Sequence, residues 1–437
     1  MTDKAAPAPG IASPSATSVS AQTRTMLWIL LIVYIFNFLD RQIVNILAEP
    51  IKGDLGLSDT ELGLLAGPAF AVFYALLGIP IARYADKEGT NRVRLIALAL
   101  AIWSAMTAVC GLAQNFVQLL LARIGVGVGE AGCTPAAHSL ISDSVAPEKR
   151  SSAIAFYGLG VPIGSLLGLI LGGIVNDLYG WRIALMLVGA PGLLLALVVL
   201  FLMREPRHHR PAEAAATASP AQLPAREAMR EILSSRAFVY ILIAASVTAF
   251  LGYGKALWTI SFFIRSHGLS TTEAGLSMAV VLGLAGVFGT WLGGKCADVY
   301  GKRDKRHILT LPAYGMAIGA PILCLGYQMA DWRVAVALLI VPTILNSAYY
   351  GPAYACVQGL VRPQARAVAA SIMLFGQNLI GLGFGPFLFG VLSDALAPTY
   401  GEESVRYVLY GAAWLGLIPA FFFWRASLRL AAELKSG

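Results

Sequence analysis

The segment Gly-Leu-Ser-Asp-Thr-Glu-Leu-Gly at residues 56–63 recurs as Gly-Leu-Ser-Thr-Thr-Glu-Ala-Gly at residues 268–275. Six of the eight positions are identical, and the two copies lie 212 residues apart. A similar spacing, 217 residues, relates Asp177 to Asp394. Repetition at this scale is typical of chains built from two equivalent halves, so we expect a duplicated fold.

The sequence around these repeats is too apolar for an ordinary soluble domain. Hydrophobic residues make up 57% of the 437 positions and charged residues only 13%, about half the usual charged share of about 25%. Runs of roughly 20 apolar residues, each long enough to cross a bilayer as a helix, occur twelve times. The expected spans are 25–47, 61–82, 93–112, 115–142, 152–175, 181–203, 237–262, 274–297, 308–329, 333–357, 368–392 and 405–427.

The twelve spans divide into two sets of six, which predicts an all-α membrane protein with two pseudo-symmetric six-helix bundles. Because six crossings return the chain to its starting side, both bundles have the same orientation. The predicted bundles cover residues 25–203 and 237–427, joined by a polar linker at 204–236. Residues 1–24, rich in Pro, Ala, Ser and Thr, are expected to be a disordered tail, and residues 428–437 a second tail.

Basic residues predict the orientation of the chain. If the N-terminus lies inside, 23 of the 32 Lys and Arg residues fall on the inner side of the membrane. By the positive-inside rule, both termini, both tails and the linker are then cytoplasmic, as in a multi-pass protein of a plasma (inner) membrane. The net charge of +8 has the same origin, so nucleic acid is not an expected partner.

The sequence gives no support for catalysis, a metal or a cofactor. The five cysteines fall singly in apolar segments without a metal-ligand spacing. There is no Walker loop, and the Gly-rich run at 125–132 lies inside an apolar helix rather than after a strand. We therefore expect neither an enzyme nor an ATP-driven pump.

Four ionisable residues stand inside the first and fourth spans, and charged side chains at such depth usually face a cavity and carry function. At about 1.5 Å per residue, Asp40 lies roughly 22 Å and Glu130 roughly 20 Å from the cytoplasmic face, so the two acids are predicted at one level. Burial disfavours an ionised carboxyl group, whereas a nearby arginine favours it. We expect Arg41 and Arg123 to compete with protons for Asp40 and Glu130, which predicts proton coupling. A static salt-bridge network between the two helices is the alternative.

A charged turn follows the second span of each half, with a Gly-xxx-Asp-xx-Gly-Arg/Lys pattern in the second copy. The glycines permit positive φ, and the acid can cap a helix or pair with arginine across the interface of the halves. The first copy departs from the pattern, with Ala82 in place of the leading glycine. The pattern resembles the signature of the major facilitator superfamily, which implies a gating role for Asp86, Gly89, Gly294, Asp298, Gly301 and Arg303.

Within that superfamily, the stretch from Asn37 to Pro50, followed by Gly-Leu-Ser-Asp-Thr-Glu at 56–61, resembles the Spinster family. The resemblance implies alternating access around a central cavity lined by helices 1, 4, 7 and 10. Spinster-like proteins are implicated in the export of lysophospholipids and sphingoid lipids, which makes an amphiphilic substrate the leading expectation. A carrier of small organic anions or drugs, and a membrane sensor or scaffold that transports nothing, are the alternatives.

The second half predicts a different cavity wall, because Lys255 is its one clear mid-span charge among many aromatic residues. An anionic head group could meet Arg41 or Lys255 while a hydrocarbon tail lies along the aromatic side chains. We expect the partners to be this substrate, protons and the bilayer, and the protein to be a monomer. The substrate-cavity candidates are Lys255, Trp258, Asn346, Tyr350, Gln377, Asn378 and His138.

Overall fold

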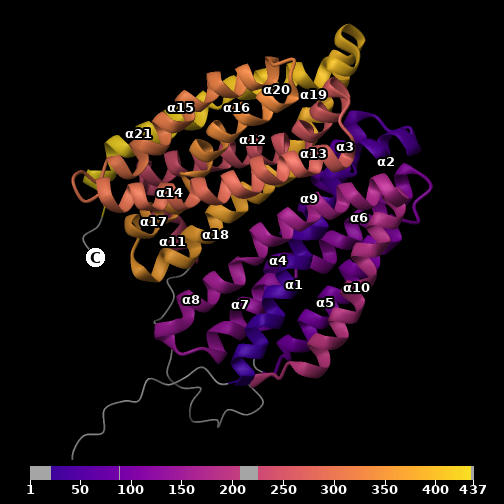
Figure 1. The fold of residues 1–437 in the computed structure, drawn as a ribbon. Helices are drawn as coiled ribbons and strands as arrows, with labels where there is room; N and C mark the ends of the chain where they lie inside the picture. The colour runs from indigo at the N-terminus through magenta and orange to yellow at the C-terminus, as the bar shows by residue number, and fades with distance from the viewer. Residues whose placement is uncertain (1–20, 88, 207–224, 435–437) are drawn as a thin grey trace, which may run out of the picture.

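The computed structural model describes residues 21–87, 89–206 and 225–434, and these residues are helical almost throughout. Two groups of helices lie side by side, one from each half of the chain (Figure 1). We call them the N lobe and the C lobe. The N lobe contains α1 (Ala21–Ile46), α2 (Ala48–Leu55), α3 (Asp59–Ala66), α4 (Pro68–Asp86), α5 (Arg92–Cys110), α6 (Phe116–Glu130), α7 (Cys133–Ser144), α8 (Pro147–Gly158), α9 (Gly160–Tyr179) and α10 (Trp181–Leu202).

The C lobe follows a short linker helix, α11 (Ala225–Ser234). Its crossings are often divided where the helix bends or widens into a π-helical or 3₁₀ turn. They are α12 (Arg236–His267), α13 (Thr271–Met278), η3 (Ala279–Leu284), α14 (Ala285–Tyr300), α15 (His307–Gln328), α16 (Trp332–Ser347), α17 (Tyr350–Leu360), η4 (Pro363–Ala365), α18 (Arg366–Gly376), η5 (Gln377–Phe384), α19 (Gly385–Tyr400), η6 (Gly401–Glu403), α20 (Ser404–Leu415) and α21 (Leu417–Glu433).

Eleven helical stretches of the described chain are long and apolar enough to cross a membrane. The last stretch, residues 363–433, crosses twice, because it turns at Gly401, whose φ is +56°. Its final residue Glu433 returns to the start of α12, where its carboxylate accepts a hydrogen bond from the hydroxyl of Ser235 at 2.8 Å. The predicted class of an all-α membrane protein with two pseudo-symmetric bundles is confirmed.

The helix ends differ from the predicted boundaries, although residues 1–20, 207–224 and 435–437 of the predicted tails and linker lie outside the described residues. Helix α1 already begins at Ala21, and α21 continues to Glu433. Within the predicted linker, α11 packs on the C lobe through Ala228 and Ile232, which are fully buried. Glu231 of α11 accepts a hydrogen bond from Arg362 at 2.8 Å, which anchors this part of the linker to the C lobe.

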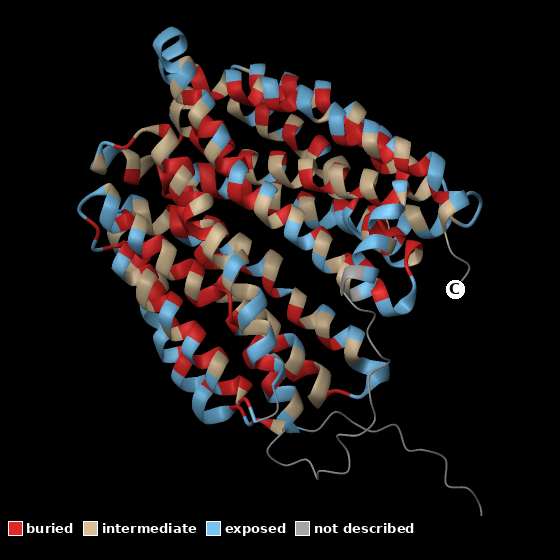
Figure 2. Cartoon of the chain, turned by 180° about the vertical axis from the view of Figure 1, so that it is seen from behind, coloured by how far each residue is buried: buried red, intermediate tan, exposed pale blue. Residues whose placement is uncertain are grey.

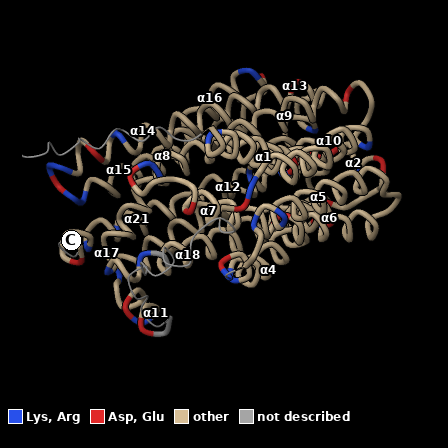
Figure 3. The backbone as a smooth tube through the Cα atoms, turned by 90° about the horizontal axis from the view of Figure 1, so that it is seen from below, with Lys and Arg blue, Asp and Glu red and all other residues tan. Residues whose placement is uncertain are grey.

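The distribution of exposed and charged residues is that of a membrane protein. Exposed residues lie on the outward sides of the helices and buried residues on the sides toward neighbouring helices (Figure 2). Many of the exposed residues are large and apolar, such as Leu194 and Phe201 of α10. Charged residues gather mainly near helix ends and loops, and the helices between them are largely uncharged (Figure 3). The apolar surfaces therefore face lipid, and the few charges at mid-depth are exceptions that need an explanation.

Small residues set how closely the helices approach. A Cβ atom added at Gly164 of α9 would overlap the backbone carbonyl of Ile35 in α1. At the end of the first crossing, Asp54 accepts hydrogen bonds from Arg182 and from the indole of Trp181, and this contact with the Arg182 guanidinium lowers the pKa of Asp54. The Gly-Trp-Arg sequence at 180–182 therefore ties α10 to α2.

We name the two ends of the molecule by their contents. The terminal end holds the first residue of α1, the last residue of α10 and the two ends of the C lobe. The far end holds α2, α3, α13 and the end of α19, which lie close together in Figure 1. In the described part of the chain, the hydrogen bonds and ion pairs that join the lobes are gathered at the far end.

Candidate functional site

The structure brings together the four charges predicted inside the first and fourth spans. The Nε atom of Arg41 donates a hydrogen bond to Oε2 of Glu130 at 2.7 Å. Nη1 of Arg123 lies 3.9 Å from Oδ2 of Asp40. Asp40 and Glu130 are both almost completely buried. The cluster therefore contains two acids and two bases in one buried volume between α1 and α6.

Aromatic rings separate the two arginines. The guanidinium of Arg41 lies 4.8 Å from the ring centre of Tyr74, 5.1 Å from Phe38 and 4.9 Å from Phe70. Phe70 also lies 5.5 Å from the guanidinium of Arg123, so one ring contacts both cations. These cation–π contacts stabilise the arginines in a region with little water. Sequence reasoning missed Phe70 and Tyr74, because an aromatic residue on an apolar helix gives no distinguishing signal.

Several polar atoms of the cluster have no hydrogen-bond partner among the described residues: Oδ2 of Asp40, Oε1 of Glu130, Nε of Arg123 and both amide atoms of Asn37. Buried polar groups are normally satisfied by protein or ordered water. The hydroxyl of Thr107 lies 2.6 Å from Oδ1 of Asp40 and 2.9 Å from the carbonyl oxygen of Trp103. Since Thr107 has one proton to donate, these contacts are compatible with either protonation state of Asp40.

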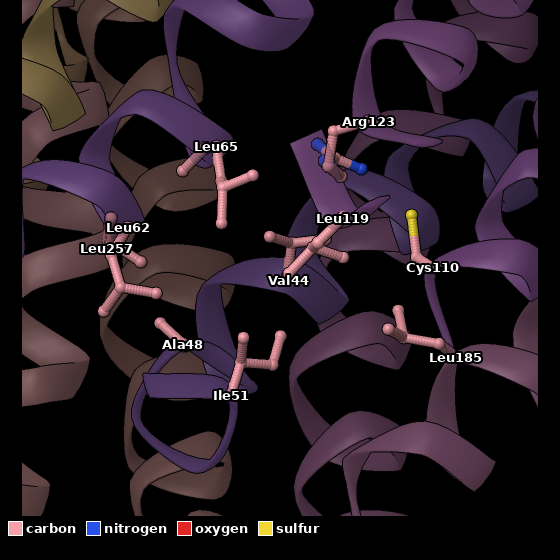
Figure 4. Close-up of a pocket in the computed structure, with 11 residues that line it drawn as sticks. Val44, Ala48, Ile51, Leu62, Leu65, Cys110, Leu119, Arg123, Leu185 and Leu257 are labelled. Carbon is pink, nitrogen blue, oxygen red and sulfur yellow. The ribbon is translucent and has the colours of Figure 1, made fainter. Parts of the chain in front are cut away.

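On its far side the cluster borders a small apolar pocket. This pocket has a volume of about 10 Å³, and Arg123 is the only charged residue among the described residues that line it. Its other lining side chains, including Val44, Leu65 and Leu257, are apolar apart from the thiol of Cys110 (Figure 4). A volume of this size is at the lower limit for one water molecule. The far side of the cluster is therefore closed by packed hydrocarbon.

A much larger cavity of about 380 Å³ lies mainly within the C lobe. Four predicted substrate-cavity residues line it: Lys255, Asn346, Tyr350 and Gln377. Lys255 is the only charged residue among the described residues of its lining. The cavity extends past α12 and α16 to α15 and α20, where the wall is formed by side chains such as Leu323. Gln42 of α1 is its one N-lobe lining residue.

The remaining substrate-cavity candidates lie elsewhere. Trp258 is buried and its indole donates a hydrogen bond to the carbonyl oxygen of Pro386 at 2.9 Å, so it packs α12 against α19. His138 is exposed, and its ring contacts Tyr157 edge-on with 5.6 Å between ring centres. Asn378 lies in η5 and does not line the cavity. Asp40 and Glu130 also line neither cavity, which differs from the expected exposure to a central cavity.

The predicted gating residues lie at the terminal end, and their recorded contacts stay within one lobe. Asp86 accepts a hydrogen bond from Ser139 of α7 at 3.2 Å, whereas Asp298 and Arg303 are exposed. Gly89 has the predicted positive φ, +82°. Gly301 has a φ of −65° and continues the helical turn after α14. At Gly294 an added Cβ would meet open space.

Sequence reasoning missed a second charged network, which joins the lobes at the far end. Arg265 of α12 donates to both carboxylate oxygens of Glu49 at 2.7 and 2.8 Å. It also donates to both oxygens of Asp59 at 2.6 and 2.8 Å, and Lys52 donates to Asp59 at 2.5 Å. Bidentate pairs of this kind are among the stronger charged contacts. These side chains, near predicted span ends, resemble ordinary loop charges in the sequence.

Comparisons with known proteins agree with this architecture. The family model of the Major Facilitator Superfamily matches residues 30–386. An MFS-type efflux pump of Mycolicibacterium smegmatis is 32% identical over 407 residues, which cover 93% of each chain. The sphingosine-1-phosphate transporter of Danio rerio is 23% identical over 421 residues, covering 90% of this chain and 82% of that protein.

A solved structure has the same fold. It is a bacterial homologue of the human lysosomal transporter Spinster in an inward-facing, unoccupied conformation. It is 31% identical to this chain, with a TM-score of 0.86, and the match covers 96% of this chain and 100% of that chain. By name, these relatives are an efflux pump, a transporter and a homologue of a transporter. The chain therefore belongs to the major facilitator superfamily, as a Spinster-like transporter.

Proposed function

We propose that this protein is a proton-coupled secondary transporter of an amphiphilic anion, with both termini in the cytoplasm. The proposal depends on one observation: two buried acids, Asp40 and Glu130, lie between two arginines that border different sides. Arg41 is partly exposed and directly precedes Gln42, which lines the large cavity, whereas Arg123 borders the small apolar pocket at the far side. The acids can therefore exchange partners as access changes from one side to the other.

The buried acids are suited to holding a proton. Oδ2 of Asp40 and Oε1 of Glu130 have no hydrogen-bond partner among the described residues. Burial disfavours an ionised carboxyl group, so a proton on either acid would lower the cost of burial and satisfy an oxygen. Thr107 supports both states, since its hydroxyl can donate to an ionised Asp40 or accept from a protonated one.

In the proposed cycle, this structure is the inward-facing state. The contacts that join the lobes lie at the far end, which is the outer end if both termini are cytoplasmic. Arg41 is engaged with Glu130 at 2.7 Å, whereas Arg123 stays 3.9 Å from Asp40. We expect the outward-facing state to reverse this preference: Arg123 closes on Asp40, and Arg41 releases Glu130. A proton taken up from outside would then be released to the cytoplasm when Arg41 returns.

The large cavity supports an amphiphilic substrate. One ammonium group, that of Lys255, is available to an anionic head group, and amide and hydroxyl groups lie nearby on α16 and η5, including Asn346 and Gln377. The deeper wall, with Leu323 and Met316, is apolar. A molecule with an anionic head and one hydrocarbon chain would satisfy both parts. The name of the zebrafish relative, a sphingosine-1-phosphate transporter, is compatible with this class.

A carrier of small organic anions or drugs is the second candidate. The name of the mycobacterial relative, an efflux pump, favours it, and a cavity of about 380 Å³ is within the range of about 300–1,000 Å³ for small-molecule sites. A sensor that does not transport would bind the same ligands but produce no flux.

A reconstituted uptake experiment separates these functions. Proteoliposomes under an imposed pH gradient are offered a lysophospholipid, the matching monoacylglycerol without the charged head, and a small aromatic acid. We expect saturable movement of the lysophospholipid that increases with the gradient. Movement of the small acid alone would favour the second candidate. Binding of the lysophospholipid without movement would contradict a transport function.

A further inference from the structure

The first copy of the repeat forms the start of α3 and docks against α19 of the opposite lobe. Ser58 and Glu61 form a capping box, in which the Ser58 hydroxyl accepts from the N–H of Glu61 and the Glu61 carboxylate accepts from the N–H of Ser58. The N–H groups of Asp59 and Thr60 donate instead to the two carboxylate oxygens of Asp394, at 3.1 and 2.7 Å. The exposed donors of this helix start are therefore satisfied partly from its own lobe and partly from the C lobe.

The second copy of the repeat makes the same arrangement in the opposite direction. Ser270 and Glu273 form the capping box at the start of α13. Asp177, at the end of α9 in the N lobe, accepts from the N–H of Thr272 at 2.8 Å and from the hydroxyl of Thr271. Asn176 adds a hydrogen bond to Thr271 at 2.9 Å. Each lobe thus supplies one acid to a helix of the other lobe.

The packing below each acid repeats with the same spacing. A Cβ atom added at Gly63 would overlap the carbonyl oxygen of Pro386, and one added at Gly390 would overlap that of Asp59. The equivalent residues at the second site make the same contacts. Gly275, which lies 212 positions after Gly63, contacts Leu169, and Gly173, which lies 217 positions before Gly390, contacts Thr271. At both sites, therefore, glycine residues let the backbones of two helices from opposite lobes come into contact. The acid lies at the end of this contact.

We infer that Asp177 and Asp394 are a matched pair of latches that hold the far side closed during the transport cycle. Each latch joins the lobes through an ionised acid and the positive end of a helix, a favourable arrangement for a carboxylate. Opening the far side must separate both pairs, since each acid and its helix belong to different lobes. The repeated octapeptide therefore does more than reflect the duplication of the chain. It supplies the helix N-terminus that each latch acid binds.

The latches set the balance between the two access states. Asn in place of Asp keeps the size of the side chain but removes its charge, and its amide nitrogen cannot accept a hydrogen bond from a helix N–H. Charge-assisted hydrogen bonds are stronger than neutral ones. We expect each variant, Asp177→Asn and Asp394→Asn, to raise the ratio of far-open to far-closed molecules about tenfold. The double variant should raise it about a hundredfold if the latches act independently.

Distance measurement between spin labels tests this inference directly. The labels are placed at Tyr179 and Glu402, which are exposed at the far end of opposite lobes. The distance between them reports the separation of the two lobes at the far end. Cys296 is replaced so that it is not labelled. The expected result is a new, longer distance component in both Asn variants. Asp331→Asn is the matched control, because Asp331 lies at the same end but caps a helix of its own lobe; it should retain the wild-type distribution.

Two further variants keep the test decisive. Asp394→Glu retains the charge and should restore most of the closed population. Thr271→Val removes the hydroxyl that donates to Asp177 and accepts from Asn176, but leaves the bond from the N–H of Thr272. It should give a smaller shift, severalfold, even if an Asn variant is not recovered as folded protein. Distance distributions of the Asn variants and of Thr271→Val that match those of wild type and Asp331→Asn would overturn the inference. The measurement needs neither substrate nor a proton gradient, so its result is independent of the proposed proton coupling.

Discussion

Lys255 provides the sharpest test of how the cavity recognises its substrate. Its ammonium group lines the large cavity, and no acidic residue occurs among the described lining residues to neutralise it. Lys255→Met keeps the length and apolar stem of the side chain but removes the charge. A hydrogen bond to a charged group contributes about 1.5–3 kcal/mol, which corresponds to about 10- to 150-fold in affinity. We expect an anionic lysophospholipid to bind more weakly by a factor in this range.

The assay compares two ligands on two proteins, so that the contribution of the Lys255 charge to binding affinity is measured separately. Binding of a lysophospholipid and of the matching uncharged monoacylglycerol is measured on wild type and on Lys255→Met in the same detergent. The monoacylglycerol should lose little affinity, because its head cannot pair with the ammonium group. Equal losses for both ligands would refute the reasoning, since Lys255 would then act by packing and not by charge. Lys255→Arg should retain most of the preference for the anionic ligand.

Three further predictions follow from buried or closely packed groups. Arg92→Met should reduce the free energy of unfolding by about 3–5 kcal/mol, because it removes the guanidinium that pairs with the buried carboxylate of Glu205. Unfolding in detergent tests this, and the exposed Arg94→Met is the control. Gly164→Ala should destabilise the protein by about 1–3 kcal/mol through overpacking, whereas Gly158→Ala, which meets open space, should not. Arg265→Gln should increase the far-open population, because it removes the guanidinium between two carboxylates; an unchanged distance distribution between labels at the far end would contradict this.

The fold was predictable because each of its sequence signals is local: each apolar run predicts one crossing independently of the others. Long apolar runs predict crossings from length alone, and the repeated octapeptide predicts two equivalent halves. The acids and arginines of the first and fourth spans also stood out, because an ionisable residue at mid-depth is costly without a partner. Helix rise then placed Asp40 and Glu130 at one level, and the structure buries both acids, each beside an arginine of the cluster. Their role in proton coupling stays a prediction.

The parts that could not be predicted depend on contacts between distant segments. Arg265 has the sequence context of a loop charge, and only the packing of α12 against α2 and α3 brings it to Glu49 and Asp59. Thr107 is one of several small polar residues in an apolar helix, and its position opposite Asp40 depends on how α5 faces α1. Trp258 was predicted to line the substrate cavity. Its indole instead donates a hydrogen bond to a backbone carbonyl of α19, a contact between distant segments that the sequence does not reveal.

The location of the cavity was also beyond sequence reasoning. Helical periodicity indicates which residues share a face, but a cavity is defined by what the neighbouring helices leave unfilled. The expected cavity lay between the lobes, whereas the large cavity extends inside the C lobe to α15 and α20. Asp40 and Glu130 are buried and line neither cavity.

Proton flux in proteoliposomes tests the central claim most directly. An internal pH indicator records acidification driven by an imposed gradient in wild type, Asp40→Asn, Glu130→Gln and the surface control Asp331→Asn, with substrate present in every sample. The account predicts substrate-dependent proton movement in wild type and the control, and its loss in both cluster variants while substrate still binds. Wild-type proton movement in both Asp40→Asn and Glu130→Gln would contradict the account.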